Sequence, residues 1–101
     1  MGELARVQAV IVGGGQAGLA TAHGLAARGV SYTVLEADRR IGDQWRRRWD
    51  SLRLFTPARY DGLPGLKFPA PAASFPGKDE MADYLDVYAR DGALRVRTGV
   101  R

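Results

Sequence analysis

The sequence of 101 residues predicts an α/β fold in which a helix connects two parallel strands. An unbroken apolar run from Val10 to Val12, within a strand expected at residues 7–12, is typical of a strand that is covered on both faces. A helical pattern follows, and a second short apolar segment occupies residues 32–36. We therefore expect a βαβ unit over residues 7–36, with its first strand at the centre of the sheet.

The helix between these strands is expected to begin at about Gln16 and to end near Arg28. Gly29 follows directly and favours the left-handed conformation that often ends a helix. Four apolar residues recur at helical spacing and define the expected buried face, namely Leu19, Ala22, Leu25 and Ala26.

Three glycines at the start of this helix follow the spacing G-x-G-x-x-G: Gly13, Gly15 and Gly18. Gly13 allows a tight turn out of the first strand, Gly15 allows a pyrophosphate to approach the backbone, and Gly18 allows close packing of helix on strand. The N-terminus of the helix, at Gln16 and Ala17, then offers free N–H groups to an anion. This pattern predicts a Rossmann-like dinucleotide-binding unit.

Glu36 ends the second strand, 18 residues after Gly18. An acid at this place accepts hydrogen bonds from the two hydroxyls of an adenosine ribose. The alternative is a strand, turn and helix that bind no ligand. It is disfavoured because glycines at these positions cost backbone entropy and return no packing.

Composition limits the other classes of function. Lys and Arg number 15 against 11 Asp and Glu, for a net charge of +4, and the arginines cluster at residues 39–40 and 46–48. The second cluster lies just after the dinucleotide unit, so we expect no nucleic-acid partner. Cysteine is absent, which excludes disulfides, thiol catalysis and thiolate metal sites within the sequence, and we expect no metal. His23 is interpreted as a surface or packing residue.

No membrane span and no signal peptide are recognised, so the cytoplasm is the expected location. A doubly wound dinucleotide fold has about five or six strands. Only three candidates occur, at about 7–12, 32–36 and 94–98. We therefore expect residues 1–101 to be the N-terminal part of an incomplete, truncated domain.

Residues 37–77 are expected to form a loop that covers the cofactor. Gln44 and Trp45 lie where the loop crosses the carboxyl edge of the sheet, although Trp45 also has a second interpretation as a core aromatic. All five prolines fall between residues 51 and 76, among apolar residues without a regular period. A large flat cofactor is one surface on which such a segment packs.

A second amphipathic helix is expected at residues 78–90. Its apolar positions follow the spacing i, i+3, i+4, i+7, and they are Met81, Tyr84, Leu85 and Tyr88. Both tyrosines are interpreted as core residues.

Five ordered motifs are similar to one known family: VGGGQAGL, VLEA, IGDQWRRRWDSLRLFTP, LPGLKFPAP and FPGKDEMADYLDVYA. Together they resemble the N-terminal FAD-binding part of flavin-containing monooxygenases, especially the bacterial flavoprotein monooxygenases and the plant YUCCA-type enzymes. The resemblance implies that residues 13–18 hold the FAD pyrophosphate and that Glu36 holds the ribose. It also implies that Gln44 and Trp45 contact the middle of FAD, and that the segment with Arg53 and Thr56 runs toward the flavin ring.

The implied activity is that of an NAD(P)H-dependent monooxygenase acting on a small organic molecule. The family's NADPH site depends on a further glycine-rich motif that is absent from this sequence, so we expect the chain alone to be inactive. No residue has the character of a general base or nucleophile, and we name no catalytic residue. Alternatives are a disulfide-reductase relative, disfavoured by the lack of cysteine, an NAD-binding dehydrogenase or sensor domain, or a non-catalytic truncated fragment. Substrate, oligomeric state and the choice between NADPH and NADH stay open.

Overall fold

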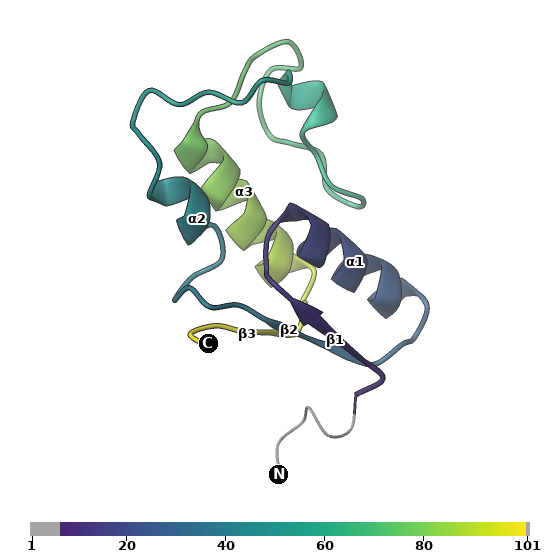
Figure 1. Ribbon diagram of the computed structural model, residues 1–101. Coiled ribbons are helices and arrows are strands. Elements are labelled where there is room, and N and C mark those ends of the chain that lie inside the picture. The colour runs from purple at the N-terminus through teal and green to yellow at the C-terminus, as the bar shows by residue number, and fades with distance from the viewer. Residues whose placement is uncertain (1–6, 101) are drawn as a thin grey trace.

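The computed structural model describes residues 7–100, so the expected limits of the domain at residues 1 and 101 lie outside the described residues. The elements follow in the order β1 (Ala9–Val12), α1 (Gln16–Ala27), β2 (Tyr32–Leu35), α2 (Asp43–Arg46), η2 (Ala58–Tyr60), α3 (Lys78–Asp91) and β3 (Val96–Arg97). Figure 1 shows two layers, with α1 and α3 side by side on one face of the sheet. The predicted α/β class is confirmed.

The three strands are parallel and lie in the order β1-β2-β3. The expectation that β1 is central is therefore wrong for the described sheet, in which β2 takes this place. An apolar run indicates that a strand is covered, but it does not indicate which strands lie beside it. The third strand is also shorter than expected, since the ladder covers only Val96 and Arg97.

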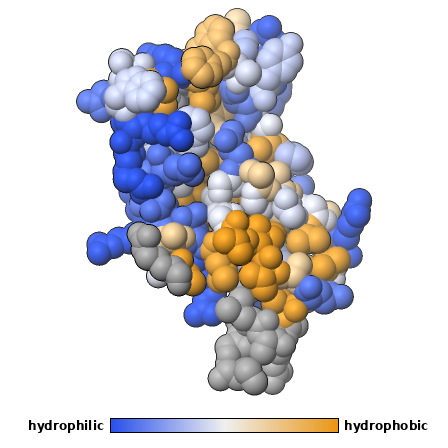
Figure 2. All heavy atoms as spheres, in the orientation of Figure 1, coloured by the Kyte–Doolittle hydropathy of each residue, from blue (hydrophilic) through white to orange (hydrophobic). Residues whose placement is uncertain are grey.

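The two faces of β1 have different environments. Ile11 faces α1, because its Cγ2 atom lies 3.3 Å from the position that a Cβ on Gly18 would take. Val10 and Val12 face the other way and are 49% and 86% exposed. Figure 2 shows an apolar patch over this part of the molecule. Within residues 7–100, only one of the two apolar faces of β1 is thus covered.

Two residues of α1 are fully buried: Ala22 packs on β2, whereas Leu19 packs in the main core with α3. Leu25 is half-buried, but Ala26, in the last turn of α1, is exposed, so the prediction that it belongs to the buried face is wrong. Gly29 ends the helix as predicted, with φ of +70° and an N–H that donates to the carbonyl of Ala26.

Helix α3 supplies most of the main core, and both of its tyrosines are buried as predicted. The hydroxyl of Tyr84 donates to the carbonyl of Leu66 and accepts from the N–H of Leu63, and the hydroxyl of Tyr88 donates to the carbonyl of Pro64. Burial raises the pKa of both hydroxyls, so they remain protonated donors at neutral pH. The tyrosines thereby attach the proline-rich segment to the core.

His23 lies against the ring of Tyr88, at 5.9 Å between ring centroids, and thus has a packing role. In the part of the chain that is described, no helix has the length and apolar character needed to cross a bilayer.

Candidate functional site

A small pocket lies beside the carboxyl ends of β1 and β2, where the glycine turn meets the start of the segment 37–77. The residues that line it come from the glycine turn, from residues 36–45 and from α3, and they are Gly14, Gly15, Glu36, Asp38, Arg40, Gly42, Gln44, Trp45 and Leu85. Its volume is about 10 Å³, at the lower limit for holding one water molecule. A large ligand would therefore lie across the mouth of this pocket and not inside it.

The glycine turn has the geometry that close approach to a ligand requires. Gly13 has φ of +100°, a conformation that residues with a Cβ rarely adopt. A Cβ on Gly18 would lie 2.0 Å from the carbonyl oxygen of Gly13, so this glycine allows α1 to pack on the turn. A Cβ on Gly15 would meet no atom within 4 Å. Packing within the described residues therefore does not explain Gly15, and the space beside its backbone is open.

The N-terminus of α1 faces this open space. Gly15 is the N-cap residue and provides no side-chain cap, and the first turn contains no acidic residue. The side chains of Gln16 and Ala17 are exposed. Free N–H groups and the positive end of the helix dipole thus remain available to an anion.

Glu36 holds the turn from the other side. Its Oε1 atom accepts from the N–H of Gly14 at 2.8 Å, and its Oε2 atom accepts from the N–H of Asp38 at 2.8 Å. A carboxylate oxygen has two lone pairs, so each oxygen retains one acceptor position. The residues present therefore fit a dinucleotide, with the pyrophosphate at Gly15 and the ribose hydroxyls at Glu36.

Gln44 and Trp45 reach the pocket on the single turn of α2. Gln44 is exposed. Trp45 is half-buried, packs against the main core and has the guanidinium of Arg48 above its ring, 4.8 Å from the centroid. Trp45 thus belongs partly to the core and partly to the lining of the pocket, and its contact with a cofactor stays a prediction.

Arg53 and Thr56 do not line this pocket. The guanidinium of Arg53 donates to the carbonyl of Phe75 at 3.2 Å and lies 3.7 Å from Glu80. The hydroxyl of Thr56 donates to the carboxylate of Asp61. A role for these two residues near a flavin ring stays a prediction.

Several residues of the pocket were not singled out from the sequence. A Cβ on Gly14 would lie 2.6 Å from Cδ1 of Ile41, and Gly42 has φ of +94°. Both glycines were visible in the sequence as possible signs of close contact. Leu85 gave no such signal, because a buried leucine on an amphipathic helix is first of all a core residue.

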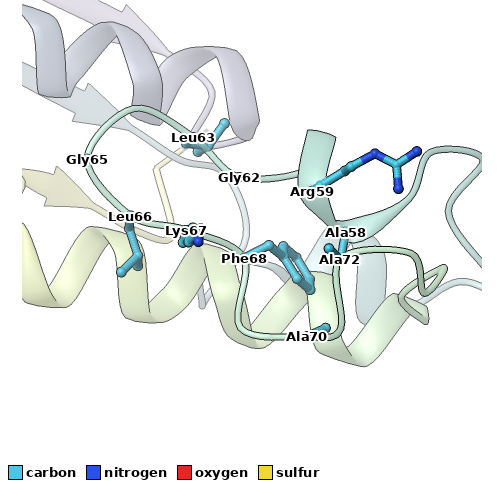
Figure 3. Close-up of a pocket in the computed structure, with 10 residues that line it drawn as sticks. All are labelled: Ala58, Arg59, Gly62, Leu63, Gly65, Leu66, Lys67, Phe68, Ala70 and Ala72. Atoms are coloured by element: carbon cyan, nitrogen blue, oxygen red, sulfur yellow. The ribbon is translucent and has the colours of Figure 1, made fainter.

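A larger cavity of about 470 Å³ lies between η2 and the turn at residues 62–68. Figure 3 shows Leu63, Leu66 and Phe68 along this turn, with the side chain of Arg59 extending from the opposite side. None of its lining residues belongs to the glycine turn or to α2. The cavity is thus separate from the candidate site.

Comparison with known proteins shows the family to which the chain belongs. The family model described as FAD dependent oxidoreductase matches residues 8–99. The indole-3-pyruvate monooxygenase YUCCA1 of Oryza sativa subsp. japonica is 45% identical over 92 residues, which are 90% of this chain and 23% of that protein.

Two solved structures are similar over most of the chain. The flavin-containing monooxygenase from Stenotrophomonas maltophilia has a TM-score of 0.84 and 38% identity, and the match covers 94% of this chain and 29% of that one. A structure of OTEMO in complex with FAD and NADP has a TM-score of 0.75 and 26% identity, over 94% and 19% of the two chains.

This chain spans about a quarter of the length of the curated relatives that it matches. Nearly all of its described residues nevertheless fall within the matched family model. The resemblance found in the sequence is thereby confirmed, and the chain belongs to the FAD dependent oxidoreductase family.

Proposed function

We propose that the chain is the FAD-binding segment of an NAD(P)H-dependent flavoprotein monooxygenase that acts on a small organic molecule. One observation carries the binding site in this proposal: the backbone of Gly15 is open to a ligand beside the N-terminus of α1, and Glu36 lies across the same pocket. The likeness to flavin monooxygenases at 38% and 45% identity supports the monooxygenase class.

In this proposal each part of the site has a binding role. The N–H groups at Gln16 and Ala17 hold the pyrophosphate, with Gly13 and Gly18 giving the turn its shape. The carboxylate of Glu36 orients the ribose. FAD supplies the redox chemistry, and this chain binds and orients it.

The remaining roles follow from the segment 37–77. Gln44 and Trp45 cover the middle of the cofactor, and Arg53 and Thr56 lie toward the flavin ring. NADPH would bind outside this chain, as would the groups that select the substrate, so we expect the chain alone to consume no NADPH. A cytoplasmic location is part of the proposal and rests on the sequence alone.

The proposal is tested on the purified full-length protein. We expect it to contain about one FAD per polypeptide, to oxidise NADPH with consumption of oxygen, and to insert one atom of ¹⁸O₂ into an organic substrate. A colourless protein that carries NAD would instead support a dehydrogenase or sensor domain. Bound FAD without oxygen consumption would support the proposed cofactor site but would contradict the monooxygenase activity.

Glu36→Ala is expected to weaken FAD binding by about 1–3 kcal/mol, the usual range for hydrogen bonds to a charged acceptor. The substitution removes the acceptor for the ribose and also releases the N–H groups of Gly14 and Asp38. Titration of the apo-protein with FAD measures the loss. Asp91→Ala, at an exposed carboxylate at the end of α3, is the control. Equal affinities in the two variants would mean that Glu36 only ends the strand.

A further inference from the structure

Helix α2 carries two of the proposed FAD contacts, yet it consists of one turn from Asp43 to Arg46. Such a short helix is not stable alone, because nucleation costs more than one turn of hydrogen bonds returns. The placement of Gln44 and Trp45 at the pocket must therefore depend on what holds α2. Its main packing partner is α3.

The N-terminal end of α2 is held by backbone contact. Gly42 is the N-cap residue with φ of +94°, and a Cβ there would lie 2.6 Å from the carbonyl oxygen of Ala82. The chain can approach α3 this closely only because residue 42 has no side chain.

Arg46, the last residue of α2, links this helix to α3. Its guanidinium donates to Asp43 at 2.8 Å and to the carbonyl of Ile41 at 2.9 Å, and it reaches Asp83 of α3 at 3.4 Å. The hydrogen bond from Arg46 lowers the pKa of the Asp43 carboxyl. This ion pair therefore stays charged at neutral pH.

Lys78 holds the C-terminal end of α2. Its side chain is buried, with only 8% exposed, and its Nζ atom donates to the carbonyl oxygen of Arg46 at 3.1 Å and to Asp79 at 2.9 Å. The second carboxylate nearby is Asp50, at 3.9 Å and fully exposed. An ammonium group that donates to the last carbonyl of a helix caps that helix.

The location of Lys78 is unfavourable in other respects. It is the first residue of α3, where the helix dipole disfavours a cation, and burial removes the ammonium group from water. The hydrogen bond from Lys78 to the carbonyl of Arg46 in α2 offsets part of this cost. Lys78 and Ala82 are one turn apart on α3, and Leu85 follows at the next turn and lines the pocket. One face of α3 thus supports both α2 and the pocket.

We infer that Lys78 is a positioning residue for the cofactor site: by capping α2 it sets the place of Gln44 and Trp45, and through them the affinity for FAD. This inference rests on the proposed function. It assigns to a residue of α3, outside the glycine turn and outside the pocket, a quantitative effect on cofactor binding.

The test is Lys78→Met in the full-length protein, because methionine has a similar length but no donor. We expect FAD affinity, measured by titration of the apo-protein, to fall by about tenfold to a hundredfold, the usual effect of losing a hydrogen bond to a charged group. We also expect faster hydrogen exchange in peptides covering residues 41–48 of the apo-protein. Lys67→Met is the matched control, since it removes the chain's other lysine, which is exposed and lies outside the pocket.

Lys78→Arg, which keeps the charge and the donors, is expected to retain most of the affinity for FAD that Lys78→Met loses. If Lys78→Met does not fold, Lys78→Gln keeps a donor and gives the same comparison with a smaller expected loss. A lower melting temperature with unchanged FAD affinity would overturn the inference, because it would show a purely structural role. Failure of the proposed function is distinct, since the unmodified protein would then bind no FAD.

Discussion

Gly15→Val is expected to abolish FAD binding while the protein remains folded. The backbone at Gly15, with φ of −84° and ψ of −166°, is extended and suits any residue, so valine introduces no strain. The added Cβ would meet no protein atom within 4 Å. It would occupy the space in which a pyrophosphate approaches the backbone. We therefore expect the substitution to weaken ligand binding and to leave the fold unchanged.

The flavin content of the purified protein and titration with FAD measure this effect, and the melting temperature of the apo-protein shows whether the fold is kept. Gly24→Val is the matched control, because Gly24 lies within α1, a Cβ there also meets open space, and the residue does not line the pocket. Full flavin content in Gly15→Val would remove the main support for the proposed site.

Gly18→Ala is expected to destabilise the protein by more than about 3 kcal/mol, beyond the usual range for overpacking. The new Cβ would lie 2.0 Å from the carbonyl oxygen and 3.1 Å from the carbonyl carbon of Gly13. Both atoms belong to the backbone, so the clash cannot be relieved by a change of rotamer. Helix α1 would have to move away from β1.

Gly24→Ala, six residues along the same helix, is expected to have the opposite effect. It meets open space and should stabilise the helix by about 0.5–1 kcal/mol, because alanine loses less backbone entropy than glycine. Chemical denaturation of the two variants measures both changes. Equal stability of the two alanine variants would show that the packing of α1 on the turn at Gly13 is looser than the structure indicates.

Features that depend only on the local conformation of the chain were predictable from the sequence. The turn at Gly13, the close packing at Gly18 and the helix end at Gly29 each follow from the conformations that glycine alone allows. Glu36 was also predictable, because the end of a parallel strand places its side chain at the edge where ligands bind. The amphipathic pattern of α3 predicted its buried tyrosines in the same way.

Contacts between distant parts of the chain were not predictable in this way. Lys78 reads as an ordinary polar residue at a helix start, and only the folded chain shows that it caps a helix 32 residues earlier. The position of β1 was misjudged for the same reason, since strand order depends on which strands pair and not on the composition of one strand. The role of Gly42 likewise depends on Ala82, which no local pattern connects to it.

The late return of β3 to the sheet has a consequence for synthesis of the nascent chain. The hydroxyl of Tyr32 accepts from the N–H of Arg95, 63 residues later, and the N–H groups of Gly99 and Val100 donate to the carbonyls of Asp38 and Glu36. At a translation rate of about 5–20 residues per second, roughly 3–13 s separate the two partners. During that interval β2 lacks β3 as its neighbour in the sheet, so the segment that carries Glu36 acquires its outer support last.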